Sequence, residues 1–422
     1  MKKQNKQKQN EVIKLIIASV IIGIACTLLG DSLKSLTDRY ETKFYGLAKN
    51  NWVFFFIFPL AGLSIIYILR QYLFRKKENK GIKEIFDSLK TRHNELPVYK
   101  IPSHFINGLL TVIFGGSSGI EVSAVVASAS IGSVTQHKAK IHHAFRKELI
   151  CAGVAAAVTV LFSSPIAGAL FAVEVIFKRV SKMAIISISF SVVTVWLCNM
   201  LLNTEPLFFI KADHWNFAVW PYFILLGIIA GLNSVYLTKS VLFFKSKFSQ
   251  ITNNAAKIVL GSLIISVSIL FFPQLYGDGY HAMRELFISS SALKLPPTLL
   301  FTLVGVLLLK PIITSVTLAA GGDGGIFAPS LFIGAFLGLL VAFVLNNFFN
   351  VGVIPINFMV IGMAAVLSAS LHAPFTAVFL ACGLIGNYEL IIPIIAACLV
   401  AKLTAKLIIP YTVYSYTPTY AK

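Results

Sequence analysis

Two glycine-rich turns recur at a fixed spacing in the two halves of this chain. Residues 115–121 (GGSSGIE) and residues 321–329 (GGDGGIFAP) each stand before an apolar segment, and they are 206 positions apart. A membrane helix that begins at such a break leaves backbone N–H groups free, and these groups attract anions. Glycine-interrupted apolar segments at corresponding places of an internal repeat indicate a binding site in mid-membrane. The paired turns therefore favour a transport protein.

The composition is that of a protein that crosses a membrane many times. Of 422 residues, 57% are hydrophobic and 13% are charged, whereas a soluble domain carries about 25% charged residues. Several apolar runs reach or approach the roughly 20 residues that span a bilayer. They cover residues 12–29, 53–69, 183–202, 217–237, 258–272, 299–320, 331–349 and 390–409. Strand-like alternation is lacking, so the sequence predicts an all-α membrane protein with several discontinuous helices.

The positions of the basic residues predict how the chain is oriented in the membrane. The formal net charge is +19, but the basic residues lie between apolar runs, so they indicate membrane topology rather than nucleic-acid binding. They concentrate in the head, residues 1–11, and in the connection 70–100, and both are expected in the cytoplasm. The run 12–29 lacks a small-residue cleavage site after it and is expected to be a retained helix.

A second pair of motifs supports an internal repeat. Residues 153–156 (GVAA) precede Pro165 by the same interval at which residues 362–365 (GMAA) precede Pro374, and this pair is 209 positions apart. The sequence predicts one integral membrane domain over residues 12–410. Its repeat halves cover about 12–205 and 215–410, and a short tail follows over residues 411–422.

Acidic residues inside the apolar region are candidates for function. Glu121 follows the first glycine turn, where two interpretations remain open. It is a helix cap favoured by the dipole, or it is a gate that occupies an anion site until a proton neutralises it. Glu174 stands before a basic segment and fits either a helix end or a proton station. Turn chemistry explains Asp323.

The second turn is the more specific of the two. Its glycines let the backbone approach a ligand closely, and Pro329 suits the first turn of a helix. The amides of Ile326, Phe327 and Ala328 would then be free to coordinate an anion such as chloride. We expect no cofactor and no metal, because the five cysteines lack metal-ligand spacing.

At these residues the chain resembles the CLC family of chloride channels and proton-coupled chloride antiporters. Residues 325–329 (GIFAP) resemble the GxFxP anion-binding motif of that family. The resemblance implies that Gly325, Ile326, Phe327 and Ala328 bind the anion. It also implies a helical bundle of two inverted repeats, without C-terminal CBS domains here, and a homodimer with a separate pore in each subunit.

The first turn carries the second part of the resemblance. Residues 119–123 (GIEVS) are similar to the family's GKEGP or GREGP motif, which places Glu121 on the gating glutamate. The same resemblance puts Gly119, Ile120 and Val122 at the anion site. Ile120 replaces the basic residue of the motif, and Val122 with Ser123 replaces Gly-Pro.

Three further positions follow from the resemblance. Tyr414 falls on the tyrosine whose hydroxyl contacts the central anion, with Tyr411 the weaker candidate. Lys80, in residues 79–84 (NKGIKE), takes the place of the anion-coordinating serine of the GSGIP segment, and a topology charge is the alternative. The internal proton glutamate is replaced by Val175, which follows Glu174.

The expected function is transport of chloride or a similar small anion across a bacterial inner membrane, with the N-terminus in the cytoplasm. Val175 favours a proton-gated channel or uniporter over a proton-coupled antiporter with another inner proton route. Two other classes remain. A secondary transporter of another solute needs more intramembrane acids, and a membrane enzyme needs a catalytic constellation. His104 and His372 are isolated in the sequence, so we expect no enzyme.

Overall fold

The structure is a computed structural model in which the described part of the chain is helical. It describes residues 2–74, 79–90, 95–139, 141–177, 181–202, 207–208, 215–290 and 296–416. Within these ranges the extended pairing is a single isolated bridge, and eight helices are long and apolar enough to cross a membrane. This confirms the expected all-α membrane fold. Parts of the basic connection 70–100 and of the tail 411–422 lie outside the described residues.

The first half contributes eight α-helices. They are α1 (Lys2–Asn50), α2 (Phe54–Ile68), α3 (Ile82–Lys90), α4 (Lys100–Ile113), α5 (Glu121–Lys138), α6 (Arg146–Phe162), α7 (Pro165–Phe171) and α8 (Lys182–Leu201). Short π-helical turns, η1 (Leu69–Leu73) and η3 (Ala172–Ile176), extend α2 and α7, and the 3-10 turn η2 (His143–Phe145) precedes α6. The basic head at residues 2–11 is the start of α1 rather than a separate segment.

The second half repeats this order with eight more helices. They are α9 (Trp220–Ser249), α10 (Asn254–Phe271), α11 (Tyr280–Ser289), α12 (Thr298–Ala319), α13 (Phe327–Asn347), α14 (Pro355–Leu371), α15 (Pro374–Ile385) and α16 (Ile391–Ile408), with 3-10 turns η4 (Phe217–Val219) and η5 (Pro273–Leu275). Equivalent helices pack alike: α5 with α6 as α13 with α14, and α1 with α8 as α9 with α16.

The two halves meet through reciprocal contacts. Thr111 accepts the N–H of Gly116 on its carbonyl and the N–H of Asp323 on its hydroxyl, at 2.8 and 2.9 Å. Thr317, 206 positions later, accepts the N–H groups of Gly322 and Ser117 in the same way, at 2.9 and 3.1 Å. Each half thus gives the turn of the other half the same contact that it receives. This pattern is expected for two halves related by a two-fold axis.

The second motif pair is also repeated in three dimensions. Ser163 ends α6 and His372 ends α14, both in the left-handed conformation, with φ of 49° and 56°. Pro165 and Pro374 then start α7 and α15, where the missing N–H of proline costs nothing. These two short helices pack against each other across the halves.

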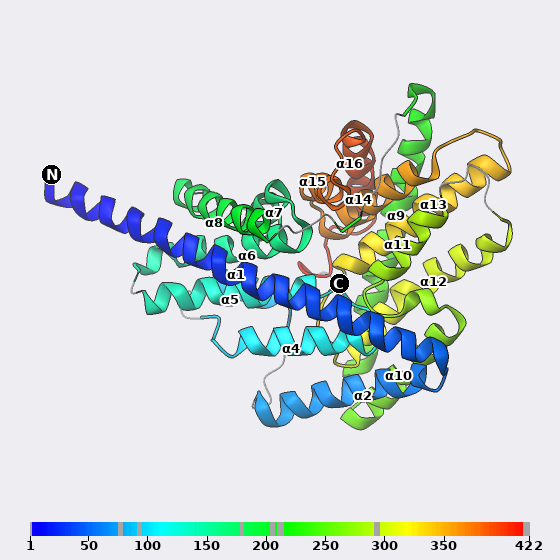
Figure 1. Ribbon diagram of the computed structural model, residues 1–422, viewed down its shortest axis with the longest axis horizontal. Helices are drawn as coiled ribbons and strands as arrows, with labels where there is room; N and C mark the ends of the chain where they lie inside the picture. The colour runs from blue at the N-terminus through cyan, green and yellow to red at the C-terminus, as the bar shows by residue number, and fades with distance from the viewer. Residues whose placement is uncertain are drawn as a thin grey trace.

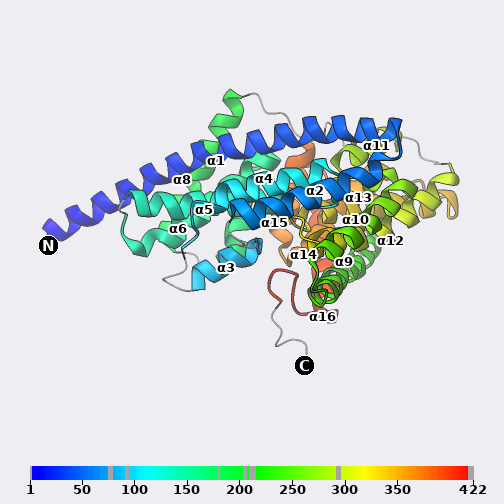
Figure 2. The same ribbon diagram turned by 90° about the horizontal axis from the view of Figure 1, so that it is seen from below.

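The core is built around α5, α6, α13 and α14, which are buried almost throughout. A Cβ atom at Gly132 would collide with the Leu149 backbone, and one at Gly338 would collide with the Phe358 backbone. Glycine at these repeated positions therefore lets each helix pair approach closely. Figures 1 and 2 show α1 running along the molecule outside this core, past α8, α5 and α4.

Candidate functional site

The two glycine turns touch at the centre of the molecule. The backbone N–H of Gly119 donates to the Gly325 carbonyl at 3.1 Å, and the N–H of Gly325 donates back at 3.2 Å. The Ser118 hydroxyl donates to the Asp323 carbonyl at 3.2 Å. Helix α5 begins two residues after one of the bridged glycines, and α13 begins two residues after the other. Two helix N-termini, each an electropositive end, thus converge on one place.

The Glu121 carboxylate lies between these N-termini. The side chain is buried, and its Oε1 accepts a hydrogen bond from the Tyr280 hydroxyl at 2.7 Å. The backbone N–H groups of Glu121 and Ala328 also face the carboxylate. A Cβ atom on Gly119 would overlap its Oε2 and would also contact Ala328. The glycine therefore makes room for the carboxylate beside the first turn of α13.

Tyr414 reaches the same place from the C-terminal segment. Its hydroxyl accepts the N–H of Ile326 at 3.3 Å and lies 2.8 Å from where a Cβ atom on Gly325 would stand. Val122 borders the same glycine. Tyr411 instead packs its ring edge-on against Tyr416 at 5.1 Å between centroids. The structure thus brings together the predicted residues of both turns and Tyr414.

The connection that contains Lys80 also reaches the site, but through its backbone. A Cβ atom on Gly81 would stand 3.3 Å from a methyl group of Val122. The Lys80 side chain is exposed, and its backbone N–H donates to the Glu84 carboxylate. The predicted role of Lys80 as an anion ligand therefore stays a prediction.

Glu174 and Val175 lie on η3, next to the start of α15. Glu174 Oε2 accepts the backbone N–H and the hydroxyl of Thr376, at 2.9 and 2.8 Å. The carboxylate therefore caps the N-terminus of α15. Val175 is buried. A proton station at Glu174 would have to leave these two hydrogen bonds.

A buried ionic cluster, which we call the histidine node, comprises Glu84, Lys100, His104 and Asp323. The Lys100 ammonium lies 2.9 Å from Glu84, and His104 lies 3.7 Å from Glu84 and 3.1 Å from Asp323. The expectation that His104 is isolated is wrong, because folding brings α3 and the second glycine turn to α4. Burial disfavours the charge on Glu84, but His104, the Lys80 N–H and Lys100 outweigh burial and lower its pKa.

A second cluster, the lysine node, was not predicted. It comprises Glu41 on α1, Asp278 before α11 and Lys310 on α12, all buried. The Lys310 ammonium donates to the Gly277 carbonyl at 3.2 Å and lies 4.4 Å from the Phe332 ring centroid. Lys310 and His104 are 206 positions apart, so the two nodes occupy equivalent places in the halves. The sequence feature that could have indicated this node is Lys310, a lysine inside the apolar run 299–320.

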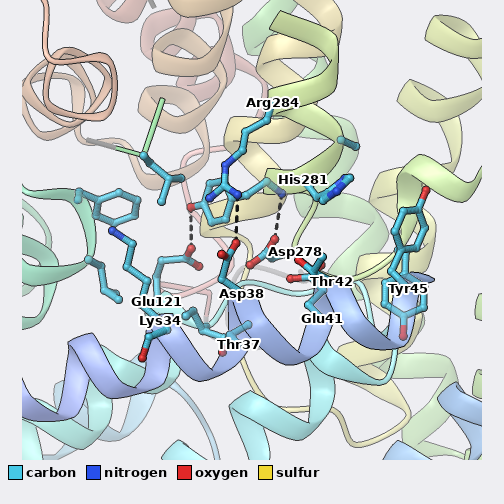
Figure 3. Close-up of a pocket in the computed structure, with 18 of the residues that line it drawn as sticks. Lys34, Thr37, Asp38, Glu41, Thr42, Tyr45, Glu121, Asp278, His281 and Arg284 are labelled. Carbon is cyan, nitrogen blue, oxygen red and sulfur yellow. Dashed lines mark hydrogen bonds and ion pairs between the residues drawn. The ribbon is translucent and has the colours of Figure 1, made fainter. Parts of the chain in front are cut away.

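A cavity of about 220 Å³ lies between α1 and α11, and Glu121 is among the residues that line it. Figure 3 shows α1 presenting Lys34, Asp38 and Glu41 toward it, with Arg284 facing them from α11. Arg284 pairs with Asp38 at 3.1 Å. Across the described ranges no group of three or more His, Cys, Asp or Glu residues could hold a metal ion. The chemistry available here is anion binding and proton transfer.

Comparisons with known proteins agree with this geometry. The family described as voltage gated chloride channel matches residues 60–406. A ClcB-like protein of Ralstonia nicotianae is 26% identical over 82% of this chain and 81% of its own length. The voltage-gated ClC-type chloride channel ClcB of Shigella flexneri is 27% identical over 71% of each chain.

The fold has a counterpart among solved structures. The X-ray structure of a slow cyanobacterial Cl⁻/H⁺ antiporter matches with a TM-score of 0.81 at 22% identity, over 95% of this chain and 96% of that one. The helices described above therefore form the same overall bundle as those of that antiporter.

Proposed function

Because the chain belongs to the voltage-gated chloride channel (CLC) family, we propose that it carries chloride or a similar small anion across a bacterial inner membrane. The ClcB relatives are bacterial. The N-terminus lies in the cytoplasm, as the basic head and connection indicate, and the protein works as a homodimer with one pathway in each subunit. It has no enzymatic activity.

The observation that carries this proposal is the placement of Glu121. Two helix N-termini converge where Gly119 and Gly325 bridge, and a carboxylate occupies that place. A site that holds a carboxylate with backbone amides and helix dipoles has the electrostatics to hold a chloride ion. Binding by partial charges rather than by a full positive charge also allows release, which conduction requires.

Glu121 is the gate in this proposal. While ionised, its carboxylate fills the anion site as a tethered competitor. A proton removes the charge and with it the attraction to the helix N-termini. The neutral side chain then vacates the site, and a chloride ion enters. Tyr414 offers its hydroxyl beside Ile326 on the other side of the site.

The pathway carries anions without tight proton exchange. Valine cannot bind a proton, so Val175 provides no inner station for one. Glu174, the acid beside it, is held by Thr376 at the N-terminus of α15. Both features support a proton-gated uniporter. A proton-coupled antiporter is the second candidate. It requires that Glu174 or water carry protons to Glu121, and the antiporter with the same fold favours it.

The test is the Glu121→Gln variant, reconstituted in liposomes with a chloride gradient. Glutamine has the shape of the protonated gate, so the variant is expected to conduct faster than the native protein and to lose most of its pH dependence. Glu389→Gln, at an exposed carboxylate before α16, serves as the control. Flux and pH profile that match the native protein would contradict the gating role.

A further inference from the structure

We propose that Tyr280 is the latch of the gate: its hydroxyl holds the ionised Glu121 carboxylate in the anion site and thereby sets the pH at which the pathway opens. This inference rests on the gating role of Glu121 proposed above. It assigns a positioning residue that neither the sequence motifs nor the glycine turns contain.

The hydrogen bond between the two residues is short and joins distant parts of the chain. Tyr280 is the first residue of α11, and its hydroxyl donates to Glu121 Oε1 at 2.7 Å. It is the hydrogen bond that the Glu121 carboxylate receives from a side chain in the described structure, and the backbone N–H groups of Glu121 and Ala328 also face the carboxylate. A hydrogen bond to an ionised oxygen is shorter and stronger than one between neutral groups. The bond therefore favours the ionised, seated carboxylate over the protonated one.

The turn before α11 fixes the position of the tyrosine. Gly277 and Gly279 adopt left-handed conformations, with φ of 60° and 92°, and a Cβ atom on Gly279 would strike the Phe332 ring of α13. The backbone N–H of Tyr280 donates to the Asp278 side chain at 2.9 Å. Lys310 of α12 donates to the Gly277 carbonyl. Because the lysine node anchors this turn from two sides, the hydroxyl is held in place beside Glu121.

Charged and titratable groups of several elements surround the latch, among them Asp31 and Asp38 of α1 and His281 and Arg284 of α11, which line the cavity. From α1, Glu41 faces the turn, and Lys34 lines the cavity. Asp278 stands before α11, and Tyr414 comes from the C-terminal segment. The lining residues of α6, Leu161 and Phe162, are apolar. Asp278 repels an ionised Glu121. Among the side chains around the carboxylate, Tyr280 donates the hydrogen bond that opposes this repulsion.

The cavity provides the space into which an unlatched side chain moves. It is lined by Ile120, Glu121 and Tyr280 at its inner end, and its volume of about 220 Å³ exceeds that of a carboxylate group. Protonation of Glu121 weakens the charge-assisted bond to Tyr280. The same proton thus empties the anion site and opens the latch.

The experiment measures the pH profile of chloride flux for Tyr280→Phe in liposomes. Without the hydroxyl, the ionised carboxylate is less favoured and a proton binds at lower proton concentration. The profile is expected to shift toward higher pH by about one unit, which corresponds to about 1.4 kcal/mol. The matched control is Tyr276→Phe. It removes a buried hydroxyl of the same turn that donates to the Ile113 carbonyl at 2.7 Å rather than to the gate, and it is expected to leave the profile in place.

Two further measurements distinguish a failure of the latch proposal from a failure of the proposed transport function. In a Glu121→Gln background, Tyr280→Phe is expected to change nothing, because there is no carboxylate to latch. Infrared titration of the carboxylic acid band that Glu121→Gln abolishes follows protonation directly, without flux, and its midpoint should move in Tyr280→Phe alone. A gate that responds to Glu121→Gln, with no shift in either readout for Tyr280→Phe, would overturn the latch and leave the proposed function standing. An infrared shift with no chloride flux in any variant would support the latch and refute the proposed transport function.

Discussion

The two halves of the molecule place different chemistry at equivalent positions. In the first half, α5 begins with Glu121, whereas the equivalent first residue of α13 is Phe327. The Phe327 ring packs against Phe162 and Phe171, at 5.5 and 5.6 Å between centroids. One helix N-terminus therefore carries a titratable side chain, and the other carries an aromatic side chain that packs against other rings. In the proposed function, the repeat supplies the anion site, and the difference between Glu121 and Phe327 supplies the gate.

The buried nodes differ in the same way. In the histidine node, the Lys100 ammonium lies 2.9 Å from Glu84, the His104 ring lies 3.1 Å from Asp323, and Asn79 also contacts Asp323 and Lys100. In the lysine node, the ammonium donates to a backbone carbonyl, while Glu41 and Asp278 line the cavity that leads to Glu121. The first node connects α3 and α4 to the second glycine turn. The second node contacts the turn before Tyr280 and borders the cavity that Glu121 also lines.

The largest effect is expected from a substitution that breaks the lysine node. Lys310→Met removes the buried ammonium that donates to the Gly277 carbonyl and attracts Asp278 and Glu41, and loss of a buried charged partner costs about 3 kcal/mol or more. The cost should fall in acid, as the carboxylates take up protons. The measurement is the apparent melting temperature of the purified protein in detergent at several pH values. Lys239→Met, on an exposed position of α9, is the control, and equal melting temperatures for the two variants would contradict an ionic lysine node.

A smaller effect is expected in the histidine node. Glu84→Gln removes the carboxylate that pairs with Lys100 and His104, at a cost of about 1–3 kcal/mol near neutral pH. The pKa of Glu84 lies below its ordinary value of 4.5. Its contribution to stability is therefore present above pH 4.5 and is lost as the pH falls through the lowered pKa. The melting curves of native protein and variant should converge in acid, and a difference that does not depend on pH would contradict this assignment.

The smallest effect is expected on anion affinity, from Tyr414 on the side of the site opposite Glu121. Tyr414→Phe removes the hydroxyl beside the Ile326 N–H, which in the proposed site donates to the anion, and the loss of one hydrogen bond of about 1 kcal/mol weakens anion binding about fivefold. Isothermal titration with bromide measures this affinity. Tyr411→Phe is the matched control, since that ring packs on Tyr416 instead. An isotherm that does not differ from the native one would remove Tyr414 from the site.

Much of the site could be predicted because the chain repeats itself. The spacing of 206 residues identified both glycine turns, and the structure joins them through Gly119 and Gly325. The helical fold followed from the apolar runs, each of which overlaps one of the eight candidate spans, although the helices that contain the runs 12–29 and 217–237 are much longer than these runs. Backbone breaks and their spacing are local properties, so a sequence displays them directly.

The lysine node and Tyr280 escaped prediction because they assemble from distant elements. Glu41 and Lys310 are single charged residues on different helices, and the turn that carries Asp278 meets them only after packing. The Tyr280 hydroxyl reaches Glu121 across 159 positions of the chain. Lys310 could have been singled out as an internal lysine in an apolar run, with His104 at the equivalent place in the other half. Tyr280 has no such signal.

The central claim is that a proton on Glu121 opens an anion pathway that does not exchange protons for chloride. The most direct test records chloride and proton movement together from liposomes that hold the purified protein and a chloride gradient. The account predicts chloride efflux that rises in acid and drives no uphill proton movement, with Val175 as the reason. Efflux that pumps protons at a fixed ratio to chloride would contradict the account, and Glu174 would then be the first residue to examine as the inner proton station.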